Sequence, residues 1–134
     1  MKREGTLLAL SVIIMQLASV LAVVRIVSVQ PITSKYGPAK IMRDGEILWT
    51  EMVNARGGFL INGTFQSVEL ISVDVGAATD AEMIQKTIKA VETVANGTYG
   101  EVHAMISPYT TFLTEAHAIA AESRKILSCA PGKP

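Results

Sequence analysis

The sequence predicts an α/β fold: a partial doubly wound parallel sheet with helices on both faces, preceded by an N-terminal signal helix. Three observations indicate this class. Short runs of Val, Ile and Leu alternate with segments of helical periodicity, the connections between them are short, and 134 residues suffice for one domain with a modest core. With right-handed crossovers, the strands counted along the chain are expected in the spatial order 2-1-3-4.

Residues 1–22 have the pattern of a signal peptide or a membrane anchor. Lys2 and Arg3 form a basic start, residues 7–21 are almost entirely apolar, and small residues lead up to Ala22. We expect cleavage after Ala22. The alternative is an uncleaved anchor, for which the apolar run is near the lower length limit of a membrane span. Either interpretation places the remaining chain on the secreted, periplasmic or extracellular side of a membrane.

The first expected strand and helix follow directly. Residues 23–29 are a β-branched run, typical of a strand buried on both faces, and Pro31 ends its hydrogen-bond ladder. The period then becomes helical over residues 39–55, and Gly57-Gly58 supplies a left-handed end. The apolar stripe of this helix comprises Ile41, Gly45, Leu48 and Met52.

The later elements repeat this alternation. Residues 68–73 are expected to form the second strand, 102–106 the third, and 126–128 the start of a fourth. Thr79 and Glu82 have the spacing of a capping box at the start of the second helix. The buried stripes are expected to be Ala81, Ile84, Ile88, Val91 and Val94 in that helix, and Leu113, Ala116, Ile119 and Ala120 in a third helix over residues 113–123.

Several classes of function are excluded by composition and spacing. Twelve basic residues balance twelve acidic ones, which gives no electrostatic case for nucleic acid. Cys129, the only cysteine, cannot form a disulfide within the chain, and it is either a buried thiol or one half of a pair with a mate elsewhere. His103, expected in a strand, and His117, expected on a helix, lack the spacing of metal ligands. We therefore expect no cofactor, no metal and no enzymatic activity.

The expected ligand site lies where the strand order reverses. In an open parallel sheet, ligands bind beyond the carboxyl ends of the strands at that point, here between the first and third strands. Thr110 and Thr111 precede a helix whose first N–H groups lack partners, so they suit capture of a carboxylate, although Thr111 also suits a plain helix cap. The candidate ligand-binding residues are Thr33, Ser34, Tyr36, Tyr109, Thr110, Thr111 and Ser128.

The order of these motifs resembles that of type I periplasmic binding proteins, which include leucine- and amide-binding proteins and receptor ligand-binding regions. The resemblance covers about residues 24–132. Residues 37–58 match its first helix, including the ending Asn54-Ala55-Arg56-Gly57-Gly58, and Asp74 keeps one acid of a family Asp-Asp pair. Ser107-Pro108-Tyr109-Thr110-Thr111 stands where the family has Gly-Pro-x-Ser-Ser, with Ser107 as the departure.

The resemblance implies that residues 23–134 are an incomplete first lobe of a domain that binds an amino acid or an amide. Its partners would be the small-molecule ligand, the second lobe, and a membrane transporter or receptor module. The alternatives are an enzyme or regulator on a generic doubly wound sheet, with only Asp74 as a charged group at a strand end, and a small membrane-anchored protein. Asn62 and Asn96 fit the N-glycosylation pattern in expected loops, where Asn-Gly also simply favours turns.

Overall fold

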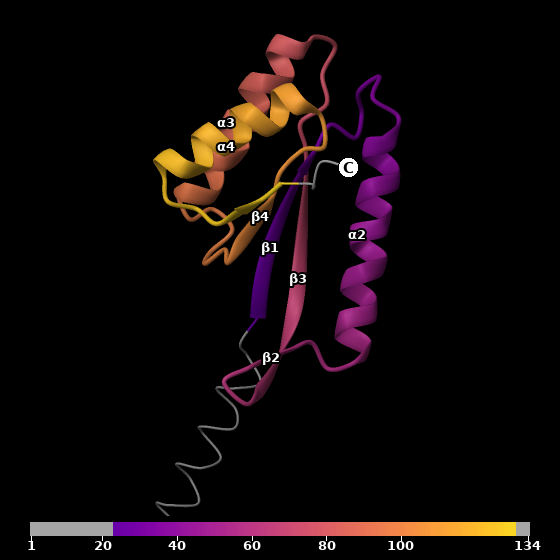
Figure 1. Ribbon diagram of the computed structural model, residues 1–134, viewed down its shortest axis with the longest axis vertical. Coiled ribbons are helices and arrows are strands. Elements are labelled where there is room, and N and C mark those ends of the chain that lie inside the picture. The colour runs from indigo at the N-terminus through magenta and orange to yellow at the C-terminus, as the bar shows by residue number, and fades with distance from the viewer. Residues whose placement is uncertain (1–22, 131–134) are drawn as a thin grey trace, which may run out of the picture.

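The computed structural model describes residues 23–130. The predicted signal peptide or anchor, residues 1–22, lies outside this part of the chain. The elements are, in order, β1 (Val23–Gln30), α2 (Pro38–Ala55), β2 (Phe59–Ile61), β3 (Thr64–Asp74), α3 (Asp80–Ala95), β4 (Ala104–Ile106), α4 (Thr111–Ser123) and β5 (Ser128–Cys129) (Figure 1). None of the described helices has the length and apolar character needed to cross a bilayer.

The sheet has five strands in the order β2-β3-β1-β4-β5. The strands β3, β1, β4 and β5 are parallel and correspond to the predicted order 2-1-3-4, which is confirmed. The sequence did not predict β2, which pairs antiparallel with the start of β3. Asn62 and Gly63 turn the chain between β2 and β3 with φ values of 50° and 78°, as a tight hairpin turn requires.

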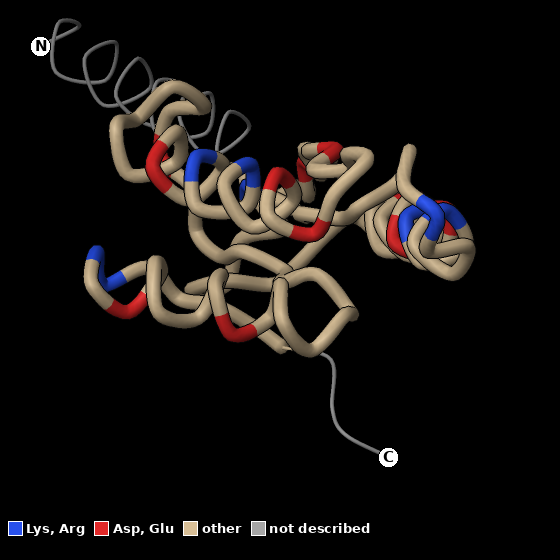
Figure 2. Tube along the Cα trace, turned by 90° about the horizontal axis from the view of Figure 1, so that it is seen from above, with Lys and Arg blue, Asp and Glu red and all other residues tan. Residues whose placement is uncertain are grey.

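Helices cover both faces of the sheet, with α2 on one side and α3 and α4 on the other (Figure 1). The larger core lies under α3 and α4, where Val27 and Val29 of β1 are fully buried. A smaller core lies under α2 and centres on Val24, Ile26 and Val68. Acidic and basic residues are interspersed along the helices seen from above, in keeping with the balanced net charge (Figure 2).

The start of α3 agrees with the sequence, and its predicted stripe is confirmed except at Ala81: Val91 and Val94 are buried, and Ile84 and Ile88 pack against the core. The Thr79 hydroxyl accepts the Glu82 N–H and the Glu82 carboxylate accepts the Thr79 N–H, which confirms the capping box. Thr87 occupies a fully buried position because its hydroxyl donates to a carbonyl one turn earlier. The predicted Ala81 is exposed instead. The buried residues are Met83, Thr87, Ala90, Val91 and Val94.

The predicted stripes of α2 and α4 are wrong in part. In α4 the buried residues are Leu113, His117, Ala120 and Ala121, while Ile119 is 71% exposed. His117 takes the inward position because Ser128 of β5 offers it a polar partner. In α2 only Ala39 is buried, and the predicted stripe faces solvent.

Smaller differences concern single residues. The strand β4 is shorter than predicted, so His103 precedes it, where its Nδ1 accepts the Arg25 N–H at 3.2 Å. Cys129 is an exposed free thiol and not a buried one. Asn62 and Asn96 are both exposed, and their glycosylation stays a prediction.

Candidate functional site

Two loops meet at the carboxyl edge of the sheet. Residues 31–37 follow β1 and residues 107–110 follow β4, and these strands are parallel neighbours. The Tyr36 ring lies 6.0 Å from that of Phe112, centroid to centroid. The pKa of Tyr109 is raised by partial burial and by the nearby Tyr36. The structure thus brings Thr33 and Thr110 to the same edge of the sheet, as the strand order predicts.

Asp74, at the end of β3, ties two of the loops together. Its Oδ1 accepts the N–H groups of Thr33 at 3.2 Å and Gly76 at 2.8 Å. Partial burial acts to raise the pKa of Asp74, but hydrogen bonds from the Thr33 side chain and from the backbone of Gly76, Thr33 and Ile32 outweigh it and lower the pKa. A Cβ on Gly76 would lie 2.5 Å from the Thr33 hydroxyl oxygen, so this close approach requires glycine. Asp74 therefore acts as an ionised organiser of the loops.

Ser34 and Tyr36 use their hydroxyls within the protein. The Ser34 hydroxyl donates to the Pro31 carbonyl at 2.6 Å and accepts the Tyr36 N–H at 3.2 Å. The Tyr36 hydroxyl donates to the carboxylate of Asp80 at 3.1 Å, at the start of α3. These bonds fix the loop after β1, and the Lys35 ammonium lies 5.4 Å from the centroid of the partly buried Tyr36 ring.

The start of α4 carries donors without partners. Thr110 is the N-cap, and its carbonyl accepts the N–H groups of Leu113 and Thr114 at 3.0 and 2.9 Å. Within residues 23–130, the buried Thr110 hydroxyl has no hydrogen-bond partner, and the N–H groups of Thr111 and Phe112 donate to no acceptor. A helix start with free N–H groups and a positive dipole end is suited to an anionic or carbonyl oxygen.

Ser128 differs from the other predicted site residues. It lies in β5, and its hydroxyl is 3.1 Å from Nδ1 of His117, so it faces α4 and not the loop after β1. His117 is fully buried, and burial lowers its pKa to about 4. Neutral His117 and Ser128 therefore join α4 to the sheet edge. The other six candidates stay predicted ligand contacts: Thr33, Ser34, Tyr36, Tyr109, Thr110 and Thr111.

The sequence analysis missed a buried polar cluster beneath the site. Gln30 is 1% exposed at the end of β1, and its amide donates to the Glu46 carboxylate of α2 at 3.2 Å. The Gln30 amide also lies 3.5 Å from the Ser107 carbonyl, which follows β4. Burial raises the pKa of Glu46, and the hydrogen bond from Gln30 only partly counters it. The sequence signal for this cluster was the pair Ser28 and Gln30, which alternate onto the same face of the strand.

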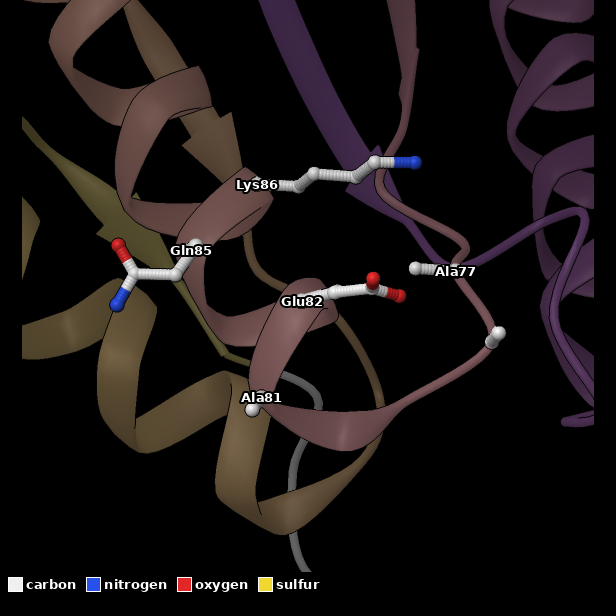
Figure 3. Close-up of a pocket in the computed structure, with 6 residues that line it drawn as sticks. Ala77, Ala81, Glu82, Gln85 and Lys86 are labelled. Carbon is white, nitrogen blue, oxygen red and sulfur yellow. The ribbon is translucent and has the colours of Figure 1, made fainter.

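A separate surface hollow of about 640 Å³ lies beside the first turns of α3 (Figure 3). Ala77, Ala81 and Gln85 form much of its wall. The ammonium group of Lys86 donates a hydrogen bond to the Gly76 carbonyl at 2.6 Å and is thereby held against the loop after β3. The hydroxyl-bearing loops do not line this hollow, which therefore is not the predicted site.

Comparison with known proteins supports the fold. No protein-family model matches the sequence, and no curated protein matches it. Among solved structures, the chain matches the crystal structure of a possible leucine/isoleucine/valine-binding protein from Rhodopirellula baltica SH 1, with a TM-score of 0.61 and 14% identity. The match covers 81% of this chain and 27% of that chain. The chain thus has the same fold as part of that protein and spans about a quarter of that protein's length.

Proposed function

We propose that residues 23–134 form the first part of the first lobe of a type I periplasmic binding protein domain. The domain captures a small solute, an amino acid or an amide, and catalyses no reaction. The observation that carries this proposal is the pairing of a hydroxyl- and aromatic-bearing loop with the unpaired start of α4 at the edge where β1 and β4 end.

The site recognises the ligand through its oxygen atoms. A carboxylate or amide oxygen accepts the N–H groups of Thr111 and Phe112, and the Thr110 hydroxyl supplies a third donor from its buried position. The rings of Tyr36 and Tyr109 cover the apolar part of the ligand. Asp74 and the buried Gln30–Glu46 pair hold the loops in place before the ligand arrives. Binding therefore costs little loop conformational entropy.

A single lobe provides only one wall of the cleft. In a two-lobed binding protein, the second lobe closes over the ligand by a hinge motion and removes the remaining water. The neighbour described above is a longer protein, of which this chain covers 27%. We therefore infer that tight binding needs the second lobe, and that a transporter or a receptor module on the outer side of a membrane uses the loaded domain.

A nuclear magnetic resonance titration of the isotope-labelled chain tests this proposal. Addition of L-leucine or acetamide should shift the amide signals of Thr111 and Phe112 saturably, with a Kd of about 1 mM because these residues supply only one wall of the proposed cleft. Thr110→Val removes the hydroxyl and keeps the shape of the side chain, so it should weaken binding several-fold. Thr93→Val is the matched control, since the Thr93 hydroxyl lies on α3 and donates to the Lys89 carbonyl.

Two results would contradict the proposal. Saturable shifts centred on the hollow beside α3 would place the ligand elsewhere, and no shift with any amino acid or amide at about 100 mM would remove the site. Micromolar binding by the isolated chain would instead overturn the inference that a second lobe is needed.

A further inference from the structure

The helix α2 turns its apolar side away from the sheet. Ile41, Leu48 and Met52 are 74%, 58% and 50% exposed, although large apolar residues on a covering helix normally face the core. The side that faces the sheet is mixed: Glu46 and Thr50 are half-buried there beside Val53, which packs on the smaller core. This reversal leaves an apolar line on the outer surface that the described residues do not cover.

The spacing of this line is that of a helix pair. Its members follow one another at intervals of four, three, four and three residues, which is the repeat that forms the contact line of two supercoiled helices. All of them are exposed, and a Cβ on Gly45 would meet no atom within 4 Å. We define this set as the α2 seam: Ile41, Gly45, Leu48, Met52 and Ala55.

Aromatic residues extend the apolar surface beyond the seam. Trp49 flanks the seam on α2 and lies 5.9 Å from Phe59 of the β2–β3 hairpin, ring centroid to ring centroid. Leu60 and Phe65 of the same hairpin are also exposed, but they form the neighbouring cross-strand pair and point to the opposite face from Phe59. The seam therefore continues through Trp49 to Phe59, and we define these residues together as the patch.

We propose that a second copy of this chain covers the patch, with the two α2 helices side by side and parallel about a two-fold axis. The charges beside the seam select this arrangement. Asp44 and Glu51 lie along one flank, and Arg56 lies along the other together with Trp49. Within the described residues, Glu51 and Arg56 form no ion pair.

A parallel pair matches the flanks, and an antiparallel pair does not. In a parallel pair, the flank with Asp44 and Glu51 lies against the flank of the other helix that carries Arg56. Glu51 of each copy then faces Arg56 of the other copy, which gives two such pairs by symmetry. In an antiparallel pair, each flank lies against the same flank of the other helix. Asp44 and Glu51 of one copy would then face Asp44 and Glu51 of the other. The parallel arrangement also directs the two carboxyl edges, and hence both loop sites, to the same end of the dimer.

Sedimentation equilibrium of the full chain tests the dimer. The seam has five residues, compared with roughly 20–30 residues per partner in a standard interface, so we expect a dissociation constant of about 10–100 μM. Leu48→Lys should raise this constant at least tenfold, and Gly45→Leu should lower it because the seam has room at that position. Ile119→Lys is the matched control, since Ile119 is also an exposed apolar residue, at 71% against 58% for Leu48, but lies on α4.

Charge reversal and cross-linking test the orientation. Glu51→Arg and Arg56→Glu should each weaken the dimer, and the two changes together should restore it. With Cys129→Ser as background, Ile41→Cys should give a disulfide-linked dimer under oxidation, because a parallel pair places the two copies of position 41 side by side.

Three results would overturn the proposal: a chain that stays monomeric at about 1 mM, a dimer that Leu48→Lys does not weaken, or a dimer in which Ile41→Cys gives no disulfide cross-link under oxidation. None of these readouts depends on ligand binding. They therefore fail or succeed separately from the proposed function.

Discussion

Acidification should destabilise this protein through one buried histidine. His117 is fully buried under α4, its Nδ1 contacts the Ser128 hydroxyl, and its Nε2 has no partner among the described residues. Burial disfavours the charged imidazolium and lowers the pKa from 6.5 to about 4. In the unfolded chain the imidazole is solvated and keeps its ordinary pKa.

The sign of the effect follows from proton binding. Above pH 6.5, His117 is neutral in both states and contributes no pH dependence. Between pH 6.5 and about 4, only the unfolded state binds the proton, so the free energy of unfolding falls by about 1.4 kcal/mol per pH unit. The total loss is about 3 kcal/mol, a large part of the 5–15 kcal/mol typical of a domain.

Urea unfolding at pH 7.5 and pH 4.5 measures this loss. His117→Gln removes the titrating group and keeps a polar side chain, so its stability should fall less on acidification than that of the wild-type chain, by about 3 kcal/mol. His103→Gln, at an exposed position just before β4, should follow the wild-type chain. Equal losses in the wild-type chain and His117→Gln would refute the argument, because the buried imidazole would then titrate normally in the folded state.

Three further changes should alter stability in proportion to their local geometry. Gly58→Ala should cost more than about 2 kcal/mol, because φ is +94° and a Cβ would overlap backbone atoms of β3, whereas Gly97→Ala, with φ of +73° and open space, should cost about 1 kcal/mol in urea unfolding; equal costs would argue against the overlap. Thr79→Ala should remove about 1 kcal/mol by breaking the capping box, measured by the thermal midpoint, and an unchanged midpoint would contradict it. Asp74→Ala should free the loops after β1 and β3 and speed amide hydrogen exchange of Gly76, and unchanged exchange would show that the carboxylate is not needed.

Much of the fold was accessible from local sequence patterns. The β-branched run at residues 23–29 and the apolar run at 68–73 predicted two neighbouring parallel strands, and the register Val23↔Ser67 to Gln30↔Asp74 confirms them. The capping box at Thr79 was also predictable, because its donors and acceptors lie within four residues. The hairpin strand β2 was missed, since three residues show too little periodicity to be recognised.

The candidate site was accessible only in part. The strand order placed the loops after β1 and β4 together. It could not show that the hydroxyls of Ser34 and Tyr36 donate hydrogen bonds to the Pro31 carbonyl and the Asp80 carboxylate. Nor could it show that Ser128 turns toward His117. These roles depend on the direction of each side chain and on partners far along the chain.

The sequence by itself determined the alternation of strands and helices, the parallel order of the sheet and the end at which the loops gather, because hydrophobic period and caps are properties of neighbouring residues. The tertiary structure decided which side of each helix is buried. The apolar spacing of residues 39–55 correctly predicts a helix. Its sheet-facing side, however, is the one that carries Glu46, which pairs with buried Gln30 of β1. A helix orients to satisfy all the groups that it covers, and a polar pair buried between two elements can outweigh an apolar stripe that another surface is left to cover.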